Sequence, residues 1–198
     1  MAWFGTERRF KRLGEVAGMR QQGIIVLQDI SDPHNAEAVF RTADALGFQH
    51  ICLIFEQEQA FDPLQVGKQS SSSANKWLSY ESYNSTAECL RKLREVGCEI
   101  VATTIDDRCE SVFNTRLDTA KIALMLGNES RGLSSEALVL SDRRLTIPMR
   151  GMVQSLNLSV TAAICLYEIT RQRLARGMEH YLLREDERAA LLGDLLKR

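Results

Sequence analysis

The sequence has no arrangement of cysteines or histidines that would hold a metal ion or a disulfide framework. Its five cysteines are scattered, odd in number and without a C-x-x-C pair, and its three histidines show no metal-ligand spacing. Most of the cysteines lie in apolar surroundings, so we expect reduced thiols in the core. These absences predict a protein without a metal centre and without structural disulfides.

Long hydrophobic runs and a large excess of one charge are also missing. No stretch is long and apolar enough to span a bilayer, and the N-terminus lacks a signal-peptide core, so we expect a cytoplasmic protein with no membrane partner. The 198 residues carry a formal net charge of −1, which by itself does not indicate a nucleic-acid partner. With 44% hydrophobic and 26% charged residues, the composition is that of an ordinary globular protein.

The common nucleotide-binding fingerprints are absent as well. Neither G-x-G-x-x-G nor G-x-x-x-x-G-K-[ST] occurs, and there is no Ser/His/Asp or Cys/His arrangement that indicates nucleophilic catalysis. An ordinary nicotinamide enzyme and an ordinary NTPase are therefore disfavoured.

Short apolar runs alternate with segments of helical periodicity through most of the chain. This alternation predicts an α/β fold, in which a mostly parallel sheet is flanked by helices on both faces. The expected strands are 23–30, 50–55, 76–80, 99–105, 121–127 and 144–149. The expected helices are 7–17, 35–46, 86–96, 134–140, 156–174 and 185–196.

Basic side chains are unevenly distributed although the total charge is small. We expect a basic N-terminal helix within residues 1–20, a main domain over residues 21–176 and a tail helix within residues 177–198. Residues 143–176 are also rich in arginine. The simplest interpretation of both basic stretches is a solvated helix face, and the alternative is a surface for a nucleic acid.

Polar residues gather where three predicted strands lead into helices, in segments 29–35, 126–134 and 147–157. Ligands of parallel α/β sheets bind where strand C-termini meet helix N-termini. In the last segment, Ser155 and Asn157 precede a long apolar helix, where free backbone N–H groups and a positive helix end meet. Because all three segments fall at one edge of the inferred sheet, they predict a polar ligand site.

Each of these positions also has a purely structural interpretation. Asn35 can be a helix N-cap, and Ser155 and Asn157 can simply begin their helix. Gly127 and Gly132 can serve only to permit a turn.

Two helices have apolar faces that bear on assembly and on the site. The predicted helix 35–46 buries one apolar face, and its Arg41 points away from that face. The predicted helix 156–174 is apolar over a broad surface, which predicts packing on the sheet and on a second subunit. Its apolar rhythm runs through Leu156, Val160, Ala163, Tyr167, Thr170 and Leu174.

The three polar segments closely resemble the motifs of the SpoU (TrmH) family of RNA ribose 2′-O-methyltransferases, in the SPOUT superfamily. The matching stretches are 32–47, 127–132 and 147–168, within a resemblance that spans about residues 20–176. Within the family, segment 151–157 is most similar to the members that methylate guanosine-18 in the D-loop of tRNA.

The resemblance implies an S-adenosylmethionine-dependent homodimer that acts on RNA, most simply tRNA, and has a deep trefoil knot in its C-terminal half. The cofactor would lie in the knotted loops, and the residues expected to line its pocket are Thr103, Gly127, Ile147, Met152, Ser155 and Leu156. RNA recognition would rest on the N-terminal helix, the loop before the last long helix and the serine-rich stretch 68–76. The residues expected to contact RNA are Arg8, Arg9, Lys11, Arg12 and Arg150.

The resemblance also assigns catalytic roles. Arg41 is the catalytic residue, which the family is proposed to use to take the proton of the 2′-hydroxyl. Asn35, Glu129 and Asn157 position it and the substrate, and Ser155 contacts the substrate phosphate or the cofactor. Because a guanidinium is protonated at ordinary pH, the alternative role of Arg41 is a cationic clamp on a phosphate and on the developing alkoxide.

Two other functions stay open from the sequence. One is ribose methylation of ribosomal RNA or of another tRNA position. The other belongs to a different class, a non-catalytic RNA-binding or assembly factor on the same scaffold. The complete catalytic set (Arg41, Asn35, Glu129, Ser155 and Asn157) argues against the second.

Overall fold

The computed structural model describes residues 7–66, 74–106 and 108–198, so most of the serine-rich stretch lies outside the described residues. Within them, seven strands form one sheet in the order β3-β2-β1-β6-β4-β7-β5, and every strand pairing is parallel. The predicted α/β class is confirmed. The strands are β1 (Gln21–Gln28), β2 (Phe48–Ile54), β3 (Ser79–Tyr83), β4 (Glu99–Thr103), β5 (Glu110–Ser111), β6 (Ile122–Leu126) and β7 (Arg143–Thr146).

Helices cover both faces of this sheet, as the sequence predicts. On β1, Ile25 and Leu27 pack beneath α2 and α5, whereas Val26 faces α3 and α4, because successive strand side chains point to opposite faces. The described helices are α1 (Glu7–Gly18), α2 (Pro33–Ala45), α3 (Thr86–Glu95), α4 (Ser135–Leu140), α5 (Leu158–Arg176) and α6 (Glu185–Leu195), with 3₁₀ turns η1 (Ala74–Trp77) and η2 (Met178–Tyr181).

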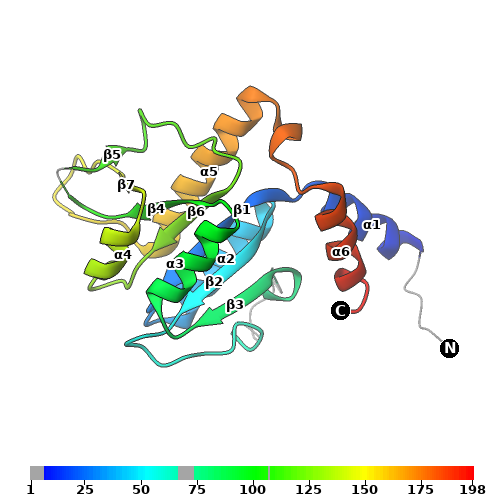
Figure 1. Cartoon of the computed structure of the whole chain (residues 1–198), viewed down its shortest axis with the longest axis horizontal. Coiled ribbons are helices and arrows are strands. Elements are labelled where there is room, and N and C mark those ends of the chain that lie inside the picture. Colours follow the sequence, from blue (N-terminus) through cyan, green and yellow to red (C-terminus); the bar gives the residue numbers. More distant parts are fainter. Residues whose placement is uncertain (1–6, 67–73, 107) are drawn as a thin grey trace.

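The first and last helices pack against each other beside the sheet (Figure 1). Leu13 and Ala17 of α1 share a small apolar core with Leu191 and Leu195 of α6, and Trp77 packs against it. The first and last helices therefore lie side by side, which the separate periodicities of residues 7–17 and 185–196 do not reveal.

Caps fix where the helices begin. Asp32 caps α2, since its Oδ1 accepts from the His34 N–H at 2.9 Å, and Pro33 occupies the first helical position. Asn35 is therefore not the N-cap, and the interpretation of this residue as a cap is wrong. Asn157 does cap α5, because its Oδ1 accepts from the Ser159 N–H at 2.8 Å.

The predicted strand 76–80 is largely wrong. Residues Ala74–Trp77 form a 3₁₀ turn, held by the Asn75 amide, which donates to the carbonyls of Pro63 and Val66 at 3.1 and 2.8 Å. The strand is β3, which continues into polar residues because it lies at the edge of the sheet and has an exposed side. The two-residue strand β5, at the other edge, has no apolar run by which the sequence could predict it.

α5 has two apolar surfaces. The buried surface consists of Leu158, Ala162, Cys165, Leu166 and Ile169, together with the buried Arg173. Most of the rhythm identified from the sequence lies on the opposite side, where Val160, Tyr167 and Leu174 are 44%, 60% and 63% exposed.

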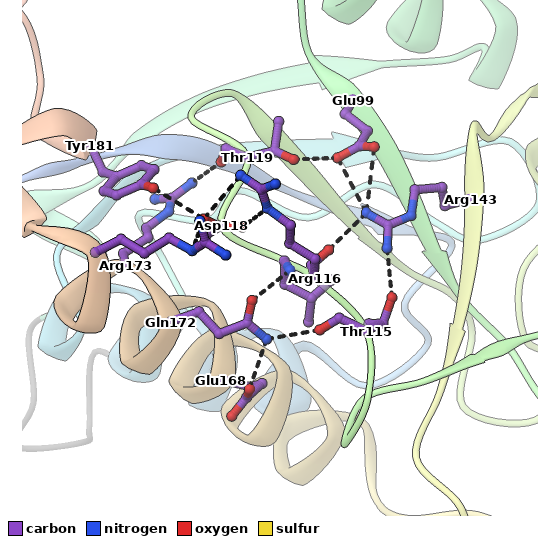
Figure 2. A network of polar contacts seen from close by, with 12 residues as sticks. Glu99, Thr115, Arg116, Asp118, Thr119, Arg143, Glu168, Gln172, Arg173 and Tyr181 are labelled. Atoms are coloured by element: carbon purple, nitrogen blue, oxygen red, sulfur yellow. Dashed lines mark hydrogen bonds and ion pairs between the residues drawn. The ribbon is translucent and has the colours of Figure 1, made fainter.

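The C-terminal half of α5 is tied to segment 112–121 by buried polar contacts (Figure 2). Arg173 donates to the backbone oxygens of Gln22 and Thr119 at 2.5 and 2.6 Å, and its guanidinium lies near the rings of Phe48 and Tyr181. Burial lowers the pKa of Arg173 to about 10, so it stays charged at neutral pH. These contacts hold the segment against the helix.

None of the helices in the described residues could span a membrane. The same part of the chain contains no group of three or more His, Cys, Asp or Glu side chains placed to hold a metal ion.

Candidate active site

A cavity of about 540 Å³ opens at the C-terminal edge of the sheet. It is bordered by the ends of β4, β6 and β7 and by the loop that leads into α5. This is the edge at which parallel α/β sheets bind ligands, and the volume is within the range of small-molecule sites. Five of the six predicted cofactor residues line it: Thr103, Gly127, Ile147, Ser155 and Leu156.

The loops from all three polar segments meet at this cavity through one hydrogen-bonded set. The Asn35 Nδ2 donates to Glu129 Oε1 at 2.9 Å, and the Asn157 Nδ2 donates to Asn35 Oδ1 at 3.1 Å. The second carboxylate oxygen of Glu129 accepts from the backbone N–H and the hydroxyl of Ser31 at 3.0 and 2.7 Å. Asn35, Glu129 and Asn157 also line the cavity, so the structure brings these three predicted residues together.

Glu129 acts as an anion in this set. Burial raises the pKa of its carboxyl, but hydrogen bonds from Asn35 and Ser31 outweigh the burial, so the pKa lies below its ordinary value. An ionised carboxylate can only accept hydrogen bonds. Glu129 therefore orients the amide of Asn35.

The turn that carries Glu129 depends on two glycines. Asn128 and Gly132 bond each other through both backbone groups at 3.0 and 2.9 Å, and Gly132 has a φ of +69°, in the left-handed region. A Cβ on Gly127 would lie 2.3 Å from the backbone of Gly132, so no side chain fits there. Gly127 is thus both a packing residue and part of the cavity wall.

The loop 149–157 supplies unused backbone donors. Within the described chain, none of its backbone N–H groups donates a hydrogen bond to another protein group. Free N–H groups beside a positive helix end suit the polar atoms of an adenine, a ribose or a carboxylate. Met152 lies in this loop but does not line the cavity, and its side chain is 100% exposed.

Arg41 does not lie in this cavity. It is exposed on the outer side of α2 and lines a second hollow, of about 670 Å³, together with Val160 and Tyr167 of α5. In this chain, the expected catalytic arginine therefore lies on a different surface from Glu129.

The residues expected to contact RNA are all exposed, and they fall into two places, four on α1 and one in the loop after β7. Arg8, Arg9, Lys11 and Arg12 are all exposed on α1. In Figure 1, α1 lies on the opposite side of the molecule from α4 and β7, near which the cavity opens. Arg150 is exposed in the loop that follows β7.

Sequence reasoning passed over two residues that build this site. Ser31 binds Glu129, and Asp29 holds a neighbouring loop through its buried carboxylate. Both fall in the polar segment 29–35, so the sequence indicates where they lie along the chain. It does not indicate which groups they bind, because those groups are distant in the sequence.

Comparisons with known proteins agree with the motifs. The SpoU rRNA methylase family model matches residues 22–167. A tRNA (guanosine(18)-2′-O)-methyltransferase of Aquifex aeolicus is 35% identical over 180 residues, which are 90% of this chain and 83% of that relative. The solved A. aeolicus TrmH/SpoU tRNA modifying enzyme superposes with a TM-score of 0.81 at 31% identity, over 96% of each chain.

Another solved structure, that of the SpoU methyltransferase AviRb from Streptomyces viridochromogenes, was determined in complex with AdoMet. It superposes with a TM-score of 0.67 at 28% identity, and the match covers 81% of this chain and 62% of that one. The chain therefore belongs to the SpoU methylase family, and its resemblance to this family is confirmed.

Proposed function

We propose that this chain methylates the ribose 2′-hydroxyl of guanosine-18 in tRNA and works as a homodimer. The reaction class is that of its family, methyl transfer from S-adenosylmethionine to a ribose 2′-hydroxyl of RNA. The single observation that carries the proposal is the linked set of Asn35, Glu129 and Asn157 at the cavity. The similarity to the A. aeolicus guanosine-18 enzyme over most of both chains supports tRNA as the substrate.

The residues around the cavity fit S-adenosylmethionine. Leu156 and Ile147 supply apolar walls, and the loop 149–157 supplies free N–H donors. Because Gly127 has no side chain, a ligand can approach its backbone closely. When bound, the cofactor supplies a methyl group already activated on a sulfonium. The protein must then align the nucleophile and assist the loss of its proton. Met152 stays outside the proposed set because its side chain is fully exposed.

Asn35 is the residue best placed to orient the ribose. Its amide is held between Glu129 and Asn157, so its position is fixed before substrate arrives. Ser155 lines the same cavity and offers a hydroxyl to a phosphate or to the cofactor. Arg41 assists proton loss either as the base that takes the proton of the 2′-hydroxyl, or as a cationic clamp on the phosphate and the developing alkoxide, in which case the proton passes to water or to a phosphate.

The homodimer brings Arg41 to the site. The outer faces of α2 and α5 form an apolar surface with Val160, Tyr167 and Leu174 exposed, and Arg41 lines the hollow in this surface. A symmetric dimer through these faces would bury this surface and place Arg41 at the subunit boundary. We infer that each active site combines Arg41 of one subunit with Glu129 and Asn157 of the other.

Mixed dimers test this shared site. Arg41→Ala and Glu129→Ala subunits, each inactive alone, are unfolded together, refolded and assayed as a mixture. If the residues act across the interface, half of the dimers regain one intact site, which gives about a quarter of wild-type activity. No regain of activity would show that both residues act within one subunit. Light scattering at micromolar concentration checks the dimer itself, and a monomeric mass contradicts it.

Ribose-methylation mapping tests the substrate. Total RNA is mapped from cells with and without the protein, and loss of a single mark at guanosine-18 of tRNA is the expected result. Loss of a mark in ribosomal RNA or at another tRNA position favours the first alternative. Calorimetry with S-adenosylmethionine addresses the second, because failure to bind the cofactor favours a non-catalytic RNA-binding factor.

Three further parts of the proposal concern the chain around the site. A deep trefoil knot is supported by segment 112–121, which is held against α5 before the chain enters β6 between β1 and β4. An experimental structure that traces residues 104–158 tests it.

RNA contact by α1 is supported by its exposed basic face, and glutamate substitutions of Arg8 and Arg12 should weaken tRNA binding. A cytoplasmic location, where tRNA is processed, is tested by cell fractionation.

The proposed division of the chain is a basic helix within 1–20, a methyltransferase domain over 21–176 and a tail helix within 177–198. Contact between α1 and α6 supports treating the two terminal segments as one appended unit. Removal of either helix should then expose the apolar core that both share.

A further inference from the structure

Arg131 supplies the only positive side chain among the described residues that line the cavity. Its Nη2 lies 2.7 Å from Glu58 Oε1, and 49% of its side chain is exposed. Glu58 is not among the lining residues, so the guanidinium is directed toward the rim of the cavity.

Glu58 is held in place by a rigid support. Asp29 follows β1 with a φ of 51°, in the left-handed region that few residues other than glycine adopt. Its buried carboxylate oxygen Oδ1 accepts from three successive backbone N–H groups, those of Glu56, Gln57 and Glu58, at 2.7, 2.9 and 3.2 Å. The loop that carries Glu58 is therefore fixed to the end of β1.

The same support reaches the turn that carries Arg131. The Asn128 Nδ2 donates to the backbone oxygen of Asp29 at 2.7 Å, and the Asn128 Oδ1 accepts from the Arg131 N–H at 3.0 Å. Asp29 thus fixes both Glu58 and Arg131 relative to Glu129. The ion pair is part of the construction of the site rather than a chance contact between two mobile side chains.

We propose that Arg131 binds an RNA phosphate next to the target ribose, and that Glu58 holds the guanidinium ready as a competing anion until RNA arrives. This inference rests on the proposed function. A ribose presented to the cavity has a phosphodiester on its own 3′ carbon, so an anion necessarily enters beside Glu129. Because Glu129 is itself anionic, a cation two residues away offsets the repulsion.

The exchange of partners is physically easy. An arginine paired with a carboxylate in a half-exposed position gains little net stability, because water screens the pair. A phosphodiester offers the same planar guanidinium a bidentate partner of equal charge, and the neighbouring phosphates of the RNA strand add to the attraction, so RNA can displace Glu58. The cofactor carboxylate is a less suitable partner, because the guanidinium faces Glu58 at the rim and not the apolar walls formed by Leu156 and Ile147.

The two members of the ion pair should respond to substitution in opposite directions. Binding of an unmethylated tRNA transcript is measured at several salt concentrations, without cofactor. Arg131→Ala should weaken binding about tenfold and reduce the slope of log affinity against log salt by about one. Arg131→Lys should recover part of the loss. Glu58→Gln keeps the shape but removes the competing charge, so it should tighten binding about threefold.

The matched control is an exposed ion pair whose members do not line the cavity. Arg91 and Glu95 lie one turn apart on α3 with Nη1 2.5 Å from Oε1, and Arg91→Ala and Glu95→Gln should leave RNA binding unchanged. Calorimetry with S-adenosylmethionine alone should give the same affinity for Arg131→Ala, Glu58→Gln and wild type.

Three results would overturn the inference. Unchanged RNA binding by Arg131→Ala would show that Arg131 does not contact the RNA. Weakened binding by both Arg131→Ala and Glu58→Gln would show that the ion pair only supports the structure of the site. Loss of cofactor affinity in Arg131→Ala assigns the arginine to the methionine carboxylate instead. Wild-type methylation of the same transcript is assayed separately, so failure of the proposed function is distinguishable from failure of this inference.

Discussion

The two ends of α5 carry polar networks that differ in burial. At the N-terminal end, Asn157 joins Asn35 and Glu129 in a set that lines a cavity and is largely open to solvent. At the C-terminal end, Arg173 is wholly buried and donates to backbone oxygens on two other segments (Figure 2). Open groups can exchange a protein partner for a ligand, whereas buried groups that lose a partner stay unsatisfied. The first network is therefore suited to binding, and the second holds the fold.

The substitution with the largest expected effect breaks the solvent-exposed network of Asn35, Glu129 and Asn157. Glu129→Ala should lower the single-turnover rate of tRNA methylation about a hundredfold or more, because Asn35 loses the group that orients it. The free energy of unfolding should change little, since the set is exposed. Rapid-quench assays at saturating cofactor and urea unfolding measure the two quantities. A large loss of stability with normal turnover would contradict the contrast between the two ends.

The buried network should respond in the opposite way. Arg173→Ala should lower the free energy of unfolding by about 3 kcal/mol, because four backbone and side-chain oxygens lose their donor. Methylation per folded molecule should stay close to that of the wild type. Arg171→Ala is the matched control, since Arg171 is exposed on the same helix and, among the described residues, pairs only with Glu168. No measurable change is expected.

A smaller effect concerns pH. Burial raises the pKa of Asp118, but hydrogen bonds and charges from Arg116 and Arg176 outweigh it, so its pKa in the folded protein is lowered. A lowered carboxyl pKa contributes stability above the unfolded value, near 4, and this contribution is lost as the pH falls through the folded value. The free energies of unfolding of wild type and Asp118→Asn, measured with urea, should therefore differ more at pH 7 than at pH 3. An equal difference at both values would show that ionised Asp118 adds nothing to stability.

The substitution with the smallest expected effect tests whether α5 holds segment 112–121 in place. Gln172 accepts from the Leu117 N–H at 2.7 Å and donates to the Thr115 carbonyl at 2.9 Å. Gln172→Ala should lower the free energy of unfolding by about 1 kcal/mol. The loss is small because the Leu117 N–H and the Thr115 carbonyl are only partly buried and can bind water instead. Amide exchange should rise first in segment 112–121, and a rise confined to α5 would contradict its role as a tie to that segment.

Much of the fold follows from patterns that are local in the sequence. Ala36, Val39 and Ala43 of α2 are buried as their spacing predicts, and the apolar runs of β1, β2 and β6 form the centre of the sheet. Ser134 caps α4, since its hydroxyl accepts from the Ala137 N–H at 3.1 Å, and a serine just before a helical segment is a local signal of such a cap. The edge strand β3 could not be predicted, because an exposed strand lacks the apolar run that identifies buried ones.

The site was predictable to the extent that its motifs are contiguous. Asn35, Glu129 and Asn157 lie in three recognisable segments, and the parallel sheet brings those segments to one edge. The position of Arg41 on a separate surface depends on which side of α2 faces the sheet and which faces outward. The burial of Arg173 depends on carbonyls about 150 and 50 residues away, and no periodicity within α5 indicates an arginine in the core.

Methyl transfer to a defined tRNA tests the central claim most directly. The purified protein is incubated with radiolabelled S-adenosylmethionine and two transcripts that differ only at guanosine-18, one with a ribose and one with a 2′-deoxyribose. Stoichiometric incorporation into the first and none into the second is the expected result. Equal incorporation into both transcripts, or none into either while cofactor and RNA both bind, would contradict it.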